Sequence, residues 1–271
     1  MEDNANKSIL NVSFYMFVDL TPIAPLKEEL RAMCSERGIK GSVILAYEGI
    51  NAMLAGPAEE LEEVLTWLVE RRDGLAQMPI KRSWTDYVPF KKLMIKVKSE
   101  IVTMREDNVD AIGQTGSHLP AEQMRDWLRA GEEMVLIDVR NDFECQIGTF
   151  RGAINPETTA FHEFPAWVRE HRGEWDGKKV VMFCTGGIRC EKATSWMLDE
   201  GVEQMYQLEG GIITYFEQIE DAEKDWDGDL FVFDERVTID TNLNETDMTM
   251  EQVKAMYPSQ SPGPKKQKER A

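Results

Sequence analysis

Histidine is scarce in this chain of 271 residues, and cysteine is almost as rare. The three histidines, His118, His162 and His171, form no sequence cluster with carboxylates, which argues against a histidine and carboxylate site for iron. The glycine pattern GxGxxG is absent, which argues against a bound flavin or nicotinamide. We therefore expect no bound metal and no bound redox cofactor.

Long apolar runs are also missing, since none approaches the roughly 20 residues needed to cross a bilayer. The N-terminal residues MEDNANK are polar and do not resemble an export signal. Four cysteines are few for a disulfide-stabilised secreted chain of this length. These absences predict a cytoplasmic protein with free thiols and no membrane partner.

Basic residues are outnumbered, with 31 Lys and Arg against 49 Asp and Glu and a net charge of −18. Such a charge repels polyanions, so a nucleic-acid partner requires a local basic face. Residues 79–105 provide a candidate, because basic side chains dominate there and Trp84, Tyr87 and Phe90 lie among them. The candidate RNA contacts are Lys81, Arg82, Lys91, Lys92, Lys96 and Lys98. The alternative is an ordinary amphipathic strand pair with its lysines facing outward.

The first half of the chain has the pattern of a small α/β sandwich. Its expected strands span 9–18, 42–46, 51–54 and 80–84, and its expected helices span 25–38 and 58–71. This order, βαββαβ, predicts a ferredoxin-like arrangement. Residues 92–104 are expected to be a strand connecting the two halves, followed by a polar linker over 106–117 with the domain boundary at Gly116.

The second half alternates helix and apolar strand. The expected elements are helices 121–129 and 190–200 and strands 134–137, 180–183 and 204–207. Apolar strands that alternate with helices predict a parallel sheet covered by helices on both faces. We therefore predict an α/β protein with an N-terminal ferredoxin-like domain and linker (1–116), a parallel-sheet domain (117–237) and a tail without stable structure (238–271).

Cys184 stands where a predicted strand of that sheet ends, which is where open parallel sheets bind ligands. The loop after it is Thr185, Gly186, Gly187, Ile188 and Arg189. Two glycines allow the backbone N–H groups to turn toward one point at the start of a helix, a site suited to an anion. Together with the charge of Arg189, this should lower the pKa of Cys184 below the usual value of about 8.5 and produce a nucleophilic thiolate.

The other cysteines carry weaker signals. Cys34 and Cys145 are expected to be packing residues, as most cysteines are. Cys190 lies in the first turn of the helix after the loop. It is either a second thiol that resolves an oxidised Cys184 or a packing residue.

Four segments resemble a rhodanese domain: DVRNDFE at 138–144, IGTFRGAINP at 147–156, CTGGIRCEKA at 184–193 and YQLEGGI at 206–212. The first half adds AYEGIN at 46–51 and PFKKLMIKVKSEIVTM at 89–104. With these, residues 9–237 resemble the bacterial tRNA uridine(34) hydroxylase family. The resemblance implies oxygen-dependent conversion of uridine 34 of tRNA to 5-hydroxyuridine, with dioxygen as co-substrate and tRNA as partner.

The same resemblance assigns roles to residues of the second half. Cys184 matches the essential rhodanese cysteine, and Asp138 and Arg140 match a DxR pattern whose expected role is to support the cysteine loop. Glu209 and Gly210 match the loop beside the active-site mouth. One departure is that no cysteine follows the FDER segment at 233–236, where many relatives have a cysteine-rich stretch, so no C-terminal metal site is expected.

Two other functions compete with the hydroxylase. A sulfurtransferase would carry a persulfide on Cys184, but it would not need the basic first half. A non-catalytic interaction module is disfavoured because inactive rhodanese domains usually lose the cysteine that this chain keeps.

Overall fold

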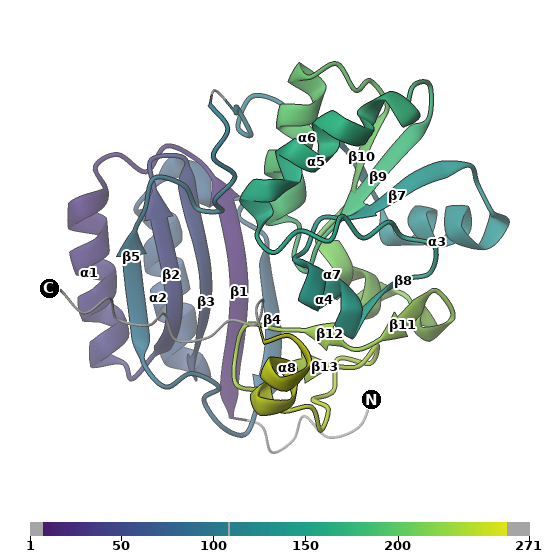
Figure 1. The fold of residues 1–271 in the computed structure, drawn as a ribbon. Helices are drawn as coiled ribbons and strands as arrows, with labels where there is room; N and C mark the ends of the chain where they lie inside the picture. The colour runs from purple at the N-terminus through teal and green to yellow at the C-terminus, as the bar shows by residue number, and fades with distance from the viewer. Residues whose placement is uncertain (1–7, 108, 259–271) are drawn as a thin grey trace, which may run out of the picture. The chain divides into compact units, whose positions relative to one another are not determined.

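The computed structural model describes residues 8–107 and 109–258, and the chain divides into two compact units (Figure 1). The first unit runs to Thr103 and includes Ala111–Gly113, and the second takes the other described residues. This division falls before the boundary expected at Gly116. Side chains explain the difference: Gln114 donates to Asp199 at 2.5 Å and Thr115 to Glu191 at 2.7 Å, which ties this stretch to the second unit.

The first unit is an α/β sandwich. Its elements are β1 Ile9–Phe17, α1 Ile23–Glu36, β2 Lys40–Ala46, β3 Gly49–Pro57, α2 Ala58–Glu70, a 3-10 turn over 73–75, β4 Ile80–Thr85 and β5 Leu93–Val97. The five-stranded sheet has the order β4-β1-β3-β2-β5. Its first four strands are antiparallel and have the ferredoxin-like order that the sequence predicted.

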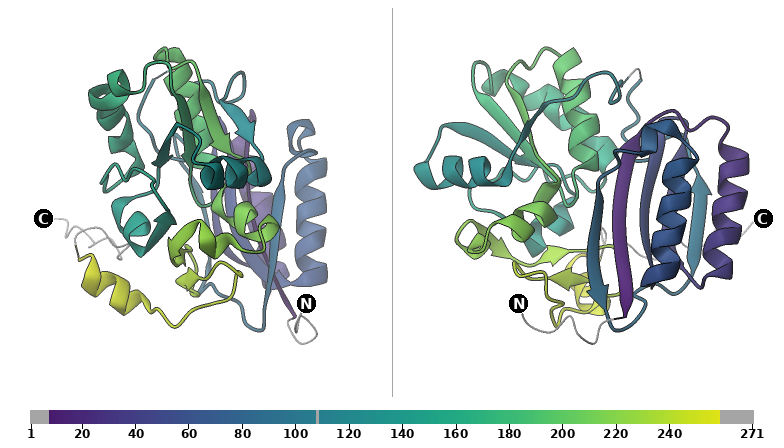
Figure 2. Two further views of the ribbon diagram at one scale, coloured as in Figure 1. Left: turned by 90° about the vertical axis from the view of Figure 1, so that its right-hand side faces the viewer. Right: turned by 180° about the vertical axis from the view of Figure 1, so that it is seen from behind.

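Residues 93–97 do not form the connecting strand expected from their alternation. They form β5, which pairs in parallel with β2 at the edge of the first sheet. Leu93 and Ile95 pack into the core, where α1 and α2 cover one face of the sheet (Figure 2). The alternation of apolar and polar residues therefore predicted a strand correctly. The position of that strand is set by its pairing with β2.

The second unit is built around a four-stranded sheet. Its elements are β6 Ser117–Leu119, α3 Ala121–Ala130, β7 Met134–Asp138, α4 Asp142–Ile147, β8 Gly148–Phe150, a 3-10 turn over 161–163, α5 Phe164–His171, a 3-10 turn over 172–174, β9 Lys179–Phe183, α6 Ile188–Asp199, β10 Met205–Leu208, α7 Gly211–Gln218, a 3-10 turn over 222–224, β11 Trp226–Gly228, β12 Leu230–Phe231, β13 Thr238–Ile239 and α8 Met250–Met256. The sheet order is β6-β10-β9-β7, and all three pairings are parallel. The predicted α/β class with a parallel second sheet is confirmed.

Apolar side chains of the parallel strands fill the core of this unit. Leu136, Val181 and Phe183 point into a cluster that includes residues of α3 and α7. At the edge of this cluster Phe150 meets Phe183 and Tyr215 edge to face, with ring centroids 4.9 and 4.8 Å apart. The strand ends that carry the candidate site are therefore held by a rigid aromatic core.

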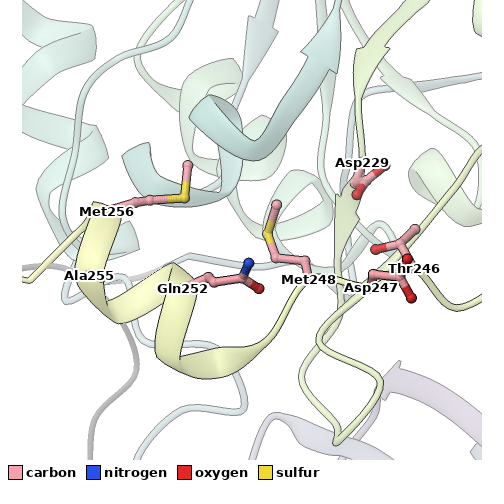
Figure 3. Close-up of a pocket in the computed structure, with 7 residues that line it drawn as sticks. All are labelled: Asp229, Thr246, Asp247, Met248, Gln252, Ala255 and Met256. Carbon is pink, nitrogen blue, oxygen red and sulfur yellow. The ribbon is translucent and has the colours of Figure 1, made fainter.

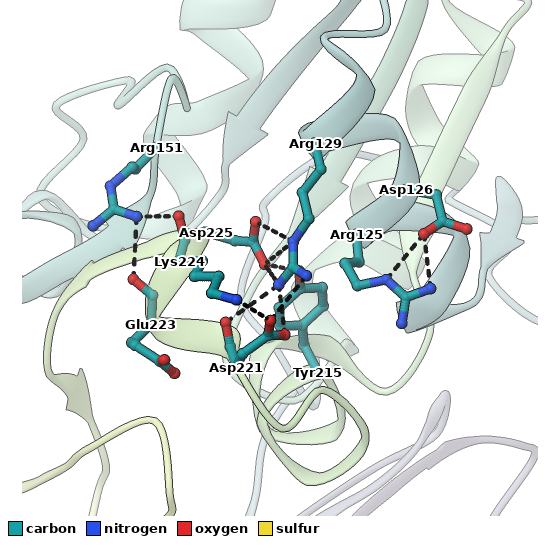
Figure 4. A network of polar contacts seen from close by, with 9 residues as sticks. All are labelled: Arg125, Asp126, Arg129, Arg151, Tyr215, Asp221, Glu223, Lys224 and Asp225. Atoms are coloured by element: carbon teal, nitrogen blue, oxygen red, sulfur yellow. Dashed lines mark hydrogen bonds and ion pairs between the residues drawn. The ribbon is translucent and has the colours of Figure 1, made fainter.

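A polar network fastens α3 to the segment after α7 (Figure 4). The guanidinium of Arg129 donates to Asp225 at 2.7 Å and to Asp221 at 2.7 Å, and the hydroxyl of Tyr215 donates to Asp225 at 2.8 Å. Asp225 is buried, at 6% exposure. Its carboxylate is paired with the Arg129 guanidinium and accepts a hydrogen bond from Tyr215. The network holds together elements that are about ninety residues apart in sequence.

The prediction of an unstructured tail from residue 238 is wrong for residues 238–258. β13 pairs with β12, and α8 begins with a capping box in which Thr249 and Gln252 satisfy each other's backbone N–H groups. Val253 of α8 is fully buried against a cluster that contains Phe143 and Phe231. Residues 259–271, which hold the sequence SQSPGPKKQKERA, lie outside the described residues.

Within residues 8–107 and 109–258, no helix combines the length and the apolarity that crossing a membrane requires.

Candidate active site

Cys184 follows β9 directly, at the carboxyl end of a central strand of the parallel sheet. Its neighbour Phe183 accepts a backbone hydrogen bond from Val139, which follows β7. The side chain of Cys184 is 0% exposed. Strand order therefore places this thiol where open parallel sheets hold their ligands.

The loop after Cys184 curls back toward the sulfur. The backbone N–H of Gly187 donates to Cys184 Sγ at 3.2 Å. Gly187 has φ of 106°, a conformation that residues with a side chain rarely adopt, and it immediately precedes the twelve-residue helix α6. Around Gly186 there is open space, since a Cβ built there would meet nothing within 4 Å. The loop therefore contacts the sulfur through the Gly187 N–H, and the space beside Gly186 is open.

The surroundings of Cys184 favour the thiolate. Burial alone would raise its pKa, but the hydrogen bond from the Cys190 thiol, the charge of Arg189 and the backbone N–H groups of Cys190 and Arg189 outweigh burial. The pKa of Cys184 is lowered to about 5. The glycines and Arg189 predicted this lowered pKa, and a thiol with such a pKa is a charged nucleophile at neutral pH.

Cys190 behaves in the opposite way. Its side chain is 0% exposed, and burial together with the neighbouring Cys184 raises its pKa well above the usual value. It therefore keeps its proton and donates it in a hydrogen bond to the Cys184 thiolate. The sequence predicts either a resolving thiol or a packing residue at Cys190, and the hydrogen bond to Cys184 adds the role of a donor.

Arg189 is held by a residue that the sequence analysis did not select. Its guanidinium donates to both carboxylate oxygens of Glu144, at 2.8 and 2.9 Å, and more weakly to Thr185 Oγ1 at 3.4 Å. Glu144 is 0% exposed and belongs to α4, where it also accepts from the backbone N–H of Asn141. One sequence feature could have pointed to Glu144. It lies in the segment DVRNDFE, which begins at the end of β7, the strand next to β9.

Asp138 and Arg140 form a buried ion pair with each other. Their further hydrogen bonds reach β8, from Arg140 to the Gly148 carbonyl and from Thr149 to Asp138 at 2.8 Å. The side chains of this pair bond to β8, and the backbone N–H of Val139 between them donates to the carbonyl of Phe183, the residue before Cys184. The side chain that binds the loop directly is Glu144.

The segment after β10 packs on the cysteine loop. The backbone N–H of Ile212 donates to the Cys184 carbonyl at 3.0 Å, and that of Ile213 to the Thr185 carbonyl at 3.2 Å. Gly211 has φ of 69°, and a Cβ there would lie 2.5 Å from the Cys184 carbonyl oxygen. The family resemblance predicted Glu209 and Gly210 beside the active site, and the close approach to Cys184 is made by the next residue, Gly211.

The remaining cysteines are packed and protonated. Burial raises the pKa of Cys34 to about 11. Burial and the charge of Asp138 raise the pKa of Cys145 well above its usual range. Both are buried, as their interpretation as packing residues requires.

The basic residues expected to form one RNA face are separated by the sheet. Lys81 and Arg82 lie on β4 and Lys96 lies on β5, which are the opposite edges of the first sheet. Arg82 is also paired with Glu62 at 2.8 Å. Lys91, Lys92, Lys96 and Lys98 are exposed. The candidate RNA contacts therefore lie at both edges of the sheet, and RNA binding by them stays a prediction.

A shallow hollow lies elsewhere in the second unit, beside α8 (Figure 3). It is lined by Asp229, Thr246, Asp247, Met248, Gln252, Ala255 and Met256. None of these belongs to the cysteine loop. In the described part of the chain, no group of three His, Cys, Asp or Glu side chains is placed to hold a metal ion.

Two family models match the chain. A model described as UPF0176 acylphosphatase like domain matches residues 9–101, and one described as Rhodanese-like domain matches residues 120–217. Among solved structures, a rhodanese-like domain from Anabaena covers 42% of this chain and 80% of its own at 17% identity and a TM-score of 0.34. An acylphosphatase from Coxiella burnetii covers 35% and 99% at 14% identity and a TM-score of 0.25. Likenesses this remote add nothing to the assignment.

The similar curated proteins are much nearer. A tRNA uridine(34) hydroxylase of Brucella suis biovar 1 (strain 1330) is 40% identical over 252 residues, which cover 92% of this chain and 80% of that protein. A protein of the same name from Mesorhizobium japonicum is 43% identical over 238 residues, which cover 87% and 75%. The sulfurtransferase alternative is not favoured by these relatives.

Proposed function

The chain belongs to the tRNA uridine(34) hydroxylase family, as its sequence resemblance predicted, and we propose that it hydroxylates uridine 34 of tRNA with Cys184 as the catalytic residue. The observation that carries the assignment of Cys184 is its place at the carboxyl end of β9, where the backbone N–H of Gly187 donates to its sulfur at 3.2 Å and the pKa is lowered to about 5. A nucleophile that is charged at neutral pH is what a cysteine-dependent reaction needs.

Three other residues serve that thiolate. Gly187 donates a backbone hydrogen bond to the sulfur, and Arg189 supplies a positive charge near it. Cys190 supplies a thiol hydrogen bond. Glu144 fixes Arg189 through two hydrogen bonds and so acts as a positioning residue.

The proposed co-substrate is dioxygen. Hydroxylation replaces one hydrogen of the uracil ring by a hydroxyl group, so one oxygen atom enters the base. The other leaves as water after taking up two protons and two electrons, which an external two-electron reductant must supply. We propose no resident redox cofactor, because the sequence has no GxGxxG fingerprint. The proposed site of action is the cytoplasm, where tRNA is found.

The exposed lysines of the first unit are proposed as RNA contacts in two groups. Lys96 and Lys98 lie at and just after β5, and Lys91 and Lys92 precede that strand. Phosphate contacts of this kind bind RNA without reading its sequence. Arg82 is the weakest candidate, because Glu62 already neutralises it.

The test uses cells that lack this protein, complemented with the wild type, Cys184→Ala or Cys34→Ala. Total tRNA is digested and 5-hydroxyuridine and its derivatives are quantified by mass spectrometry, with immunoblots to show equal protein levels. We expect wild type and Cys34→Ala to restore the modification and Cys184→Ala to leave it absent. If the wild type restores nothing, the proposed activity is wrong, and if Cys184→Ala restores it, the proposed catalytic residue is wrong.

A further inference from the structure

Phe233 is an aromatic side chain outside the cysteine loop. It is 42% exposed, whereas Phe231 two residues earlier is 0% exposed. Among the described residues of the second unit, it is the only Phe, Tyr or Trp side chain that is exposed. The fold therefore leaves this ring in contact with solvent.

The turn that carries Phe233 is rigid. After it, Asp234 accepts from the Arg236 guanidinium at 2.6 Å and from the Arg236 backbone N–H at 3.0 Å. Val232 N–H donates to the Val237 carbonyl at 2.9 Å, which closes the turn between β12 and β13. The Phe233 ring also packs edge to face on Phe231, with centroids 5.1 Å apart. A ring fixed in this way loses little conformational entropy on binding.

A short chain of contacts connects this turn to the cysteine loop. Phe231 packs edge to face on Phe143 of α4, with centroids 5.0 Å apart, and β12 lies beside α4 (Figure 1). The residue after Phe143 is Glu144, which binds Arg189. The same short helix, α4, therefore packs on Phe231, which supports the exposed ring of Phe233, and binds Arg189, whose charge lies near Cys184.

We propose that Phe233 is a stacking platform for an unpaired base of the RNA loop that contains the reacting uridine. This inference rests on the proposed function, because it concerns the same substrate. Single-stranded RNA loops expose unstacked bases, and proteins bind these on aromatic side chains. A single exposed ring fits one base better than a protein surface, because contiguous apolar patches are what mark protein interaction sites.

The test compares Phe233→Leu, which keeps an apolar side chain but removes the flat ring, with Phe233→Trp, which keeps a ring. Met256→Ala is the control, because Met256 is an exposed apolar side chain of the same unit, at 55% exposure. The full-length proteins are titrated with an RNA hairpin of the anticodon stem and loop, and Kd is measured by fluorescence anisotropy. The same variants are expressed in the complementation assay for 5-hydroxyuridine.

We expect Phe233→Leu to raise Kd about tenfold, while Phe233→Trp and Met256→Ala stay within about twofold of wild type. The inference is overturned if Phe233→Leu binds like wild type, if Phe233→Trp is as weak as Phe233→Leu, or if Met256→Ala weakens binding equally. These outcomes are separate from failure of the proposed function, which would appear as a wild type that restores no 5-hydroxyuridine. Thermal unfolding of each variant is measured to check that the substitution leaves the fold intact.

Discussion

Glu144 accepts two hydrogen bonds from the guanidinium of Arg189, at 2.8 and 2.9 Å, and the carboxylate is completely buried. Burial removes both charges from water, and each is stabilised by the other, with the Cys184 thiolate as a further negative charge near Arg189. Their pairing joins α4 to the loop that holds the thiolate.

Replacing Glu144 by Gln should destabilise the fold by roughly 3 kcal/mol, because it leaves the buried Arg189 charge without its counter-charge. The measurement is urea unfolding of the two proteins at neutral pH. Asp227→Asn is the control, since its ion pair with Arg151 is exposed and its loss should cost less than about 1 kcal/mol. Equal losses in the two variants would contradict a special role for the Glu144 pair.

Replacing Cys190 by Ala should raise the pKa of Cys184, because the thiolate loses a hydrogen-bond donor. Cys190→Ser keeps a donor and should give a pKa nearer to that of wild type. The measurement is a pH titration of thiolate absorbance in the ultraviolet, in proteins that also carry Cys34→Ala and Cys145→Ala. A titration that is the same in Cys190→Ala and wild type would show that Cys190 is only a packing residue.

The pH dependence of stability offers an independent check on the Cys184 thiolate. Its folded pKa of about 5 lies below the value of about 8.5 in the unfolded chain. Between these values the unfolded chain binds the extra proton, so the contribution of Cys184 to stability grows as pH rises and is lost as pH falls toward 5. The stability of wild type relative to Cys184→Ser, measured by urea unfolding, should therefore increase from pH 5.5 to pH 8.5. A difference that stays constant across this range would mean that Cys184 is protonated in the folded protein.

The parts of this site that could be predicted from sequence are the local ones. Cys184, the two glycines and Arg189 lie within six residues, so their meeting at a strand end follows from chain geometry alone. Glu144 lies 45 residues before Arg189, and its partner is fixed only when β7 and β9 pair. The distribution of the basic residues could not be predicted for the same reason, because β4 and β5 are near in sequence and are separated by three strands in the sheet.

The structured C-terminal segment shows a second limit. Residues 238–258 lack a clear helical or strand period, yet Val253 is buried and Thr249 caps α8. Short elements of this kind gain their stability from the surface on which they pack rather than from their own pattern. That surface, which includes Phe143 and Phe231, is assembled from distant parts of the chain.

Gly211 should tolerate no side chain, because a Cβ would lie 2.5 Å from the Cys184 carbonyl oxygen and 2.9 Å from the backbone of Gly186. Gly211→Ala must therefore push the cysteine loop away from α7, and we expect a loss of roughly 2–4 kcal/mol in stability together with loss of 5-hydroxyuridine formation. The matched control is Gly177→Ala. Gly177 has nearly the same backbone conformation, with φ of 73° against 69°, but nothing lies within 4 Å of its Cβ position.

The two variants thus share the strain of a left-handed alanine, which costs about 1 kcal/mol, and differ only in the clash. Urea unfolding measures the stability of both, and the complementation assay measures their activity. Gly177→Ala should keep the modification and lose only the smaller amount of stability. If Gly211→Ala resembles Gly177→Ala in both measurements, the close packing of the Ile212 segment on Cys184 is not required for the site.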